Sequence, residues 1–225
     1  NKGSLLEVIM RLDKIEGLQR IRLGSLEPRV ITEEFAKTLS SSKKICPHFH
    51  LSLQSGCDAT LKRMNRKYDT ATYFAAVELI RRVFPTAAIT TDVIVGFCGE
   101  TDEEFAQTLA FVQKVGFADV HVFPYSPRQG AVSAKWKDTD PVVKKHRAEV
   151  LGELKLQLKE HFALANKGSM QRVLVEEIVD GKAVGYTPNY LRVYFDADPL
   201  TVGTLVDVVV GEPYADGATA TPVQG

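Results

Sequence analysis

The sequence predicts an α/β domain built on a parallel sheet, followed by a long helix and a small closed barrel of β-strands. Helical and strand patterns alternate over residues 1–140, as is typical of repeated βα units. From residue 168 onward the pattern changes to short strands. Five strands in about 55 residues fit a closed barrel of the oligonucleotide-binding kind.

The elements of the first part follow from apolar periodicity. In residues 4–15 the apolar side chains recur at helical spacing, and Ser4 with Glu7 forms a capping box. The same reasoning predicts the strands 20–25, 49–54, 88–95 and 119–123 and the helices 32–40, 72–84 and 102–115. Strands joined through helices form a parallel sheet, either open or curved into part of a barrel.

An amphipathic pattern over residues 141–166 predicts a connecting helix. The strands predicted after it are 171–179, 183–186, 191–195, 205–210 and 218–223, with turns at Asp180-Gly181, Asp198-Pro199 and Asp216-Gly217. We therefore expect three parts: an α/β domain (1–140), a connecting helix (141–166) and a β-barrel (167–225).

Composition sets broad limits on function. The 28 basic and 28 acidic residues cancel, so total charge does not indicate a nucleic-acid binder. No stretch approaches the roughly 18 consecutive apolar residues of a membrane span, and the first residues lack a signal-peptide pattern. We expect a soluble cytoplasmic protein that does not contact a membrane.

The cysteines and three of the histidines do not predict a metal site. Cys46, Cys57 and Cys98 are separated by 10 and 40 residues, which matches neither a disulfide scaffold nor a close-spaced metal site. We expect reduced structural thiols. Strand alternation accounts for the three histidines as ordinary strand residues. Metal ligation is therefore not predicted for His48, His50 and His121.

Small and polar residues follow each predicted strand of the α/β domain. In a parallel sheet the carboxyl ends of the strands form the ligand crevice. Gly96 and Gly99 let main chain approach a ligand closely, and Thr101 with Glu104 forms a capping box. Ordinary strand-to-helix turns explain any one of these segments alone.

Taken together, the segments resemble the radical-SAM methylthiotransferase family. The matching blocks, in order, are Arg22-Leu23-Gly24-Ser25-Leu26-Glu27-Pro28, Ser52-Leu53-Gln54-Ser55-Gly56, Leu61-Lys62-Arg63-Met64-Asn65-Arg66-Lys67-Tyr68, Asp92-Val93-Ile94-Val95-Gly96-Phe97, Gly99-Glu100-Thr101 and Phe123-Pro124-Tyr125-Ser126. The tail from about residue 168 resembles that family's TRAM domain, a small β-barrel associated with RNA binding. Blocks 52–56 and 120–126 are most similar to the branch that acts on N6-threonylcarbamoyladenosine, while the isopentenyladenosine and ribosomal-protein aspartate branches share most motifs.

This resemblance implies a partial radical-SAM barrel and an enzyme that uses S-adenosylmethionine (SAM) and [4Fe–4S] clusters. In the family, SAM cleavage gives an adenosyl radical that removes hydrogen from C2 of an adenosine at position 37 of tRNA, and methylthiolation follows. The implied partners are tRNA and an electron donor for the cluster.

The family holds its clusters through a Cys-x-x-x-Cys-x-x-Cys motif and three further cysteines. None of these six is found here, so we expect the C-terminal part of a longer protein, without the first barrel strands and inactive alone. Two smaller departures are Cys98, where the family usually has proline, and Ala131, where threonine is common.

The resemblance places SAM at the carboxyl edge of the sheet. It implies ribose contacts from Gln54 and Ser55, whose alternative role is a strand-end hydrogen bond to backbone. It also implies that Val95, Gly96 and Phe97 flank the adenine, although sheet core is an alternative for Val95 and Phe97.

Three further residues are implied to contact SAM or substrate. Ser25 and Glu27 end the first strand, where a proline-terminated loop is the alternative. Arg66 offers a fork of donors to the SAM carboxylate or an RNA phosphate. A solvated helix face explains the rest of the basic run 62–67.

The tail is acidic, which limits how it binds RNA. Residues 166–225 hold four basic and eight acidic residues, a net charge of −4, so counterion release cannot drive tight binding. A local patch with base stacking remains, for which Tyr186, Tyr190 and Arg192 are the candidates.

Two other functions remain open. One is a non-catalytic RNA-binding or scaffold module with the same fold. The other is an α/β barrel enzyme without clusters that acts on a phosphorylated small molecule, which the absence of a Gly-rich phosphate loop disfavours.

Overall fold

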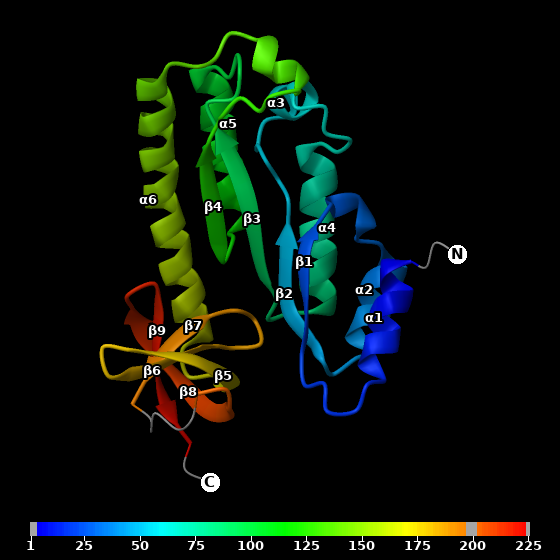
Figure 1. Cartoon of the computed structure of the whole chain (residues 1–225), viewed down its shortest axis with the longest axis vertical. Coiled ribbons are helices and arrows are strands. Elements are labelled where there is room, and N and C mark those ends of the chain that lie inside the picture. Colours follow the sequence, from blue (N-terminus) through cyan, green and yellow to red (C-terminus); the bar gives the residue numbers. More distant parts are fainter. Residues whose placement is uncertain (1–3, 197–201, 224–225) are drawn as a thin grey trace.

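The computed structural model describes residues 4–196 and 202–223, and Figure 1 shows an open sheet and a small barrel joined by a long helix. The elements up to that helix are α1 Leu5–Asp13, β1 Ile21–Leu26, the 3₁₀ turn η1 Pro28–Val30, α2 Glu33–Ser40, β2 Ile45–Leu51, α3 Asp58–Arg63, α4 Thr70–Val83, β3 Ala88–Val95, α5 Asp102–Val115, β4 Asp119–Pro124 and the 3₁₀ turn η2 Val132–Lys135.

The predicted parallel sheet is confirmed. Its strands pair in the order β1-β2-β3-β4, all parallel, and the sheet is open among the described residues. Figure 1 shows α4 and α5 together behind one face of it. Apolar side chains of the strands and helices form the core there, among them Phe49, Leu51, Tyr73, Ile89 and Val112.

The second strand was predicted at 49–54, and this prediction is wrong at both ends. The strand β2 runs from Ile45 to Leu51. Its beginning was hidden by Pro47, which cannot donate a ladder hydrogen bond. Its end is set by Gln54, which has a φ of 71° and keeps only an isolated bridge to Val93. The short helix α3 was not predicted, because its six residues give too little periodicity.

The connecting helix α6 runs from Pro141 to Asn166, as predicted. Asp140 caps its first turn by accepting a hydrogen bond from the Val142 amide at 2.8 Å. None of the described helices combines the length and the apolar composition needed to cross a bilayer.

The predicted five-stranded barrel is confirmed as closed, with the strand order β5-β6-β7-β9-β8. The strands are β5 Met170–Val179, β6 Lys182–Tyr186, β7 Arg192–Phe195, β8 Leu205–Tyr214 and β9 Gly217–Pro222. β8 is longer than predicted because it continues past a register shift between Val210 and Pro213. The predicted turn at Asp198-Pro199 lies outside the described residues.

The barrel packs beside the amino ends of the sheet strands. Arg20, just before β1, donates a hydrogen bond to the Tyr186 carbonyl at 3.1 Å. Asn189 of the barrel donates to the carbonyl of Thr86, two residues before β3, at 3.2 Å, and to Asn166 Oδ1 at 2.8 Å. The barrel is thereby fixed to both the sheet and the end of α6.

Candidate functional site

Two cavities lie along the face of the sheet that is opposite α4 and α5. The first, which we call the carboxyl-end cavity, has about 560 Å³ and is lined by Gln54, Arg66, Asp92, Ile94, Phe123, Pro124, Tyr125, Ser126, Arg128, Ala131 and Ser133. The second, the histidine cavity, has about 570 Å³ and is lined by Arg22, Leu23, Gly24, Ser25, His48, His50, Asp92, His121, Phe123 and Tyr190. The two share Asp92 and Phe123 and therefore adjoin.

Gln54 and Arg66, both predicted to contact SAM, meet in the carboxyl-end cavity. The Gln54 amide donates to the Asp92 carbonyl at 2.8 Å, and its carbonyl accepts from the Ile94 amide at 2.9 Å. This backbone pairing holds Gln54 over β3. Arg66 Nε is buried without a hydrogen-bond partner among the described residues. Arg66 lines the cavity, where its guanidinium group offers donors to a carboxylate or phosphate.

Ser55 lies beside the cavity wall and not in its lining. Its side chain is fully buried, and its Oγ lies 3.2 Å from Thr108 Oγ1 and accepts from the Cys57 amide at 3.2 Å. The left-handed backbone at Gln54 turns the next side chain inward, toward α5. In this structure Ser55 therefore shapes the loop that carries Gln54.

In the segment predicted to flank the adenine, Gly96 lies against Lys144 of α6. Gly96 has a φ of 69°, and a Cβ added to it would meet Lys144 Cγ at 2.3 Å. Phe97 sets its ring edge-on to Tyr125, with 4.9 Å between centroids, and Val95 is fully buried. Neither Val95, Gly96 nor Phe97 lines the carboxyl-end cavity, whereas the neighbouring Ile94 does.

A buried ion pair secures this loop to α6. Arg147 donates to Glu100 Oε2 at 2.7 Å, and the two side chains are 5% and 0% exposed. Arg147 also reaches the exposed Asp102 at 2.7 Å. Burial raises the pKa of Glu100, while the Gly96 amide and Arg147 oppose that rise. The position of β3's carboxyl end thus depends on α6.

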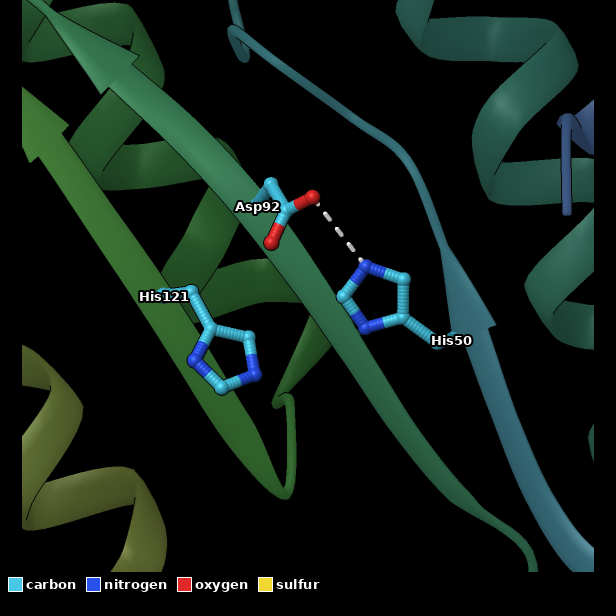
Figure 2. A group of neighbouring side chains, drawn as sticks. All are labelled: His50, Asp92 and His121. Atoms are coloured by element: carbon cyan, nitrogen blue, oxygen red, sulfur yellow. Dashed lines mark ion pairs between the residues drawn. The ribbon is translucent and has the colours of Figure 1, made fainter. Parts of the chain in front are cut away.

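The histidine cavity brings together polar side chains of all four strands of the sheet. Thr90 Oγ1 lies 2.9 Å from His48 Nε2 and 3.0 Å from His50 Nδ1. His50 Nε2 in turn lies 3.3 Å from Asp92 Oδ2, and Figure 2 shows His121 beside that pair. Burial, followed by the charge of Arg22, lowers the pKa of His48 to about 3. His48 is therefore neutral at pH 7.

The residues predicted to bind RNA lie where the barrel meets the sheet. Tyr190 stacks on Tyr186 at 4.6 Å and on His48 at 4.5 Å, and the Arg22 guanidinium lies 4.5 Å from its ring centroid. Arg192 pairs with Glu177 at 2.5 Å and with Asp216 at 3.0 Å. Tyr190 is still 43% exposed, so part of the residue is accessible.

The remaining predicted residues are dispersed. Ser25 is exposed and lines the histidine cavity, while Glu27 is exposed beside η1 and lines neither cavity. In the basic run 62–67, for which a solvated helix face was the alternative, Arg63 is partly exposed and pairs with Glu104 of α5 at 2.5 Å. The three cysteines are free and buried.

Several cavity residues were missed by sequence reasoning. Asp92 and Ile94 share one side of β3, so strand alternation would have placed both on the face that carries the cavities. Tyr125 and Ser126 were recognised only as part of a motif. Ser133, in η2, carries no local pattern that would indicate a place near the sheet.

Comparisons with known proteins agree with this architecture. The family model described as "Radical SAM superfamily" matches residues 3–112. The solved structure titled "Coproporphyrinogen III oxidase (HemN) from Escherichia coli is a Radical SAM enzyme" shares the fold, with a TM-score of 0.57 and 20% identity over 84% of this chain and 51% of that one.

The threonylcarbamoyladenosine tRNA methylthiotransferase MtaB of Bacillus subtilis is 37% identical over 221 residues, which is 94% of this chain and 49% of the relative. The chain belongs to the radical-SAM methylthiotransferase family. The tRNA-2-methylthio-N(6)-dimethylallyladenosine synthase of Carboxydothermus hydrogenoformans is also 37% identical, over 94% of this chain and 49% of that protein. The chain spans about half the length of the curated relatives it matches.

Membership in this family implies SAM and [4Fe–4S] clusters as cofactors. The carboxyl-end cavity fits SAM in three respects. Its volume is in the range of small-molecule sites. It combines aromatic and aliphatic walls with polar groups. The unpartnered Arg66 Nε suits a carboxylate. Cys46 lies in β2, Cys57 just before α3 and Cys98 between β3 and α5, and among the described residues they do not form a ligand set for a cluster.

Proposed function

We propose that this chain binds SAM in the carboxyl-end cavity and forms part of an enzyme that methylthiolates C2 of N6-threonylcarbamoyladenosine at position 37 of tRNA. The observation that carries the proposal is Arg66, whose buried Nε has no hydrogen-bond partner among the described residues, beside Gln54 at one end of a cavity of about 560 Å³. The relatives named as tRNA methylthiotransferases support the reaction class.

In this proposal Arg66 pairs with the carboxylate of SAM, and Gln54 offers its side-chain amide to the ribose. Ile94 and Phe123 supply apolar surface that excludes water around the adenosyl group. When a cluster and SAM are bound, they supply the radical chemistry, while these residues hold and orient SAM. The dispersion of Cys46, Cys57 and Cys98 supports the further proposal that this chain alone does not cleave SAM.

The tail has a matching role in the proposal. Its closed barrel acts as a TRAM-like module, and tRNA approaches along the exposed part of Tyr190, next to the histidine cavity. An electron donor for the cluster completes the partners. A cytoplasmic location belongs to the proposal because tRNA is the substrate named for the relatives.

Ligand binding to the purified chain tests the cavity. We expect Arg66→Gln to weaken SAM binding at least about tenfold, as for loss of a charged hydrogen bond, and to leave 5′-methylthioadenosine, which lacks the carboxylate, unaffected. Lys67→Gln is the control, since Lys67 is exposed in the same basic run. Titration calorimetry that shows no SAM binding, or equal losses for both ligands, would contradict the assignment of Arg66.

The substrate is tested separately, by nucleoside mass analysis of tRNA from cells with and without the gene that encodes this sequence. We expect loss of 2-methylthio-N6-threonylcarbamoyladenosine on deletion. Loss of the dimethylallyladenosine derivative instead would move the protein to the other branch of the family. Unchanged tRNA would overturn the proposed reaction.

A further inference from the structure

His50, Asp92 and His121 project from the adjacent strands β2, β3 and β4 toward one another (Figure 2). The register fixes this meeting, because Asp92 pairs directly with His121, and His50 pairs with Thr90, two residues before Asp92. One potential ligand atom from each side chain lies within 4.8 Å of the other two. We propose that these three residues bind one divalent transition-metal ion, such as Zn²⁺ or Fe²⁺, in the histidine cavity.

The distances suit such an ion. His50 Nε2 and Asp92 Oδ2 are 3.3 Å apart. Two ligands that each lie about 2.0–2.1 Å from a tetrahedral zinc are separated by roughly 3.3–3.4 Å. His121 is exposed, so a small side-chain rotation brings its imidazole to the third position without disturbing the sheet.

The surroundings of His50 resemble those of a metal-bound imidazole. A ligating histidine usually donates its other ring N–H to a nearby oxygen, which fixes the tautomer and the ring. His50 Nδ1 lies 3.0 Å from Thr90 Oγ1. With the proton on Nδ1, the lone pair of Nε2 faces the Asp92 carboxylate, and a cation between the two acceptors resolves their repulsion. The opposite tautomer gives a metal-free alternative, in which Nε2–H donates to Asp92.

Charge and access also favour an ion. Among the described residues, the only ion pair of Asp92 is with His50, so no lysine or arginine neutralises this partly buried carboxylate. Two imidazoles and one carboxylate suit zinc or iron better than magnesium or calcium, which prefer oxygen ligands. The cavity of about 570 Å³ leaves room for water or a ligand oxygen at the remaining positions. This proposal does not depend on the proposed tRNA reaction.

Metal binding is tested on the purified chain after chelation and dialysis. We expect calorimetry to show one equivalent of Zn²⁺, and Co²⁺ to give visible bands without thiolate charge-transfer absorption. His50→Gln, Asp92→Asn and His121→Gln should each weaken Zn²⁺ binding at least about tenfold. The matched control is the double variant His146→Gln/His161→Gln, which removes the two exposed histidines of α6 and should bind normally.

Thr90→Val adds a test of the supporting hydrogen bond and should lower Zn²⁺ affinity about tenfold or more. Circular dichroism checks that each variant is folded. Absence of stoichiometric binding by the unaltered chain would establish the metal-free hydrogen-bonded alternative. A dissociation constant unchanged in all three ligand variants, or a cobalt–thiolate band that assigns the ion to cysteine, would equally overturn the proposal.

Discussion

Tyr190 of the closed barrel lies flat against His48 of β2, with 4.5 Å between ring centroids and 15° between ring planes. These residues are 142 positions apart and belong to the two folded parts of the chain. Their stack couples the position of the barrel to the floor of the histidine cavity, which both rings line.

A double-mutant cycle should measure that coupling. Stacked aromatic pairs contribute about 0.5–1.5 kcal/mol beyond area burial, so Tyr190→Leu and His48→Gln together should destabilise the chain less than the sum of the single changes. The measurement is urea denaturation of the four proteins. Tyr190→Phe keeps the ring and should behave like the unaltered chain, while strictly additive effects would show that the stack contributes nothing.

Gly96→Ala should be markedly more destabilising than Gly99→Ala. Both glycines have positive φ, of 69° and 74°, so each substitution carries backbone strain of about 1–2 kcal/mol. Only at Gly96 does the new Cβ meet Lys144 Cγ, at 2.3 Å, which adds about 1–3 kcal/mol of overpacking. Thermal unfolding measures the difference. Equal losses at the two glycines would mean that Lys144 moves aside freely.

The buried pair Glu100–Arg147 should contribute far more to the free energy of unfolding than a surface pair does. Glu100→Gln leaves the Arg147 guanidinium buried, with the exposed Asp102 as its one remaining charged partner among the described residues, at an expected cost of about 3 kcal/mol. Lys145→Gln removes an exposed pair with Glu149 and should cost less than about 0.5 kcal/mol. Denaturant midpoints compare the two, and a small effect of Glu100→Gln would indicate that water reaches Arg147.

Glu104 should make stability depend on pH. Hydrogen bonds from Arg63 lower the pKa of Glu104 below its ordinary 4.5, although burial opposes this. The unfolded chain therefore binds the proton first, so this contribution is complete above pH 4.5 and is lost as pH falls toward the folded-state pKa. The stability gap between the unaltered chain and Glu104→Gln should shrink as the pH falls below about 4.5. Glu153→Gln, on the exposed side of α6, is the control, and a gap that stays constant would refute the assignment.

Sequence patterns predicted helices and strands well where the residues of a single segment are enough to fix its secondary structure. The Thr101–Glu104 capping box begins α5 as expected, and α6 has the predicted bounds. The meeting of His50 with Asp92 was not predictable in this way, because it depends on the register between two strands about 40 residues apart.

The site residues also divide into features set by local sequence and features set by distant parts of the chain. Gln54 was predicted as the last residue of a strand, whereas β2 ends three residues earlier, at Leu51. The left-handed φ of Gln54, which turns Ser55 away from the cavity, has no signature in a residue that is not glycine. Gly96 was recognised as a position where something approaches the main chain closely. The approaching group is Lys144, from a helix that follows 45 residues later, and single-sequence reasoning gives no means of finding it.

The helix α6 sets the rotation of the barrel relative to the sheet. Arg147 fixes its first half to Glu100, Lys155 reaches Asp119 at 3.2 Å, and Asn166 at its end meets Asn189 of the barrel. One residue inserted after Lys159 would turn everything beyond it by about 100° and advance it by about 1.5 Å. Tyr190 would then swing away from His48, whereas an insertion of seven residues, close to two full turns, would restore the angle and displace the barrel by about 10 Å. The pitch of this one helix therefore sets which barrel surface faces the sheet.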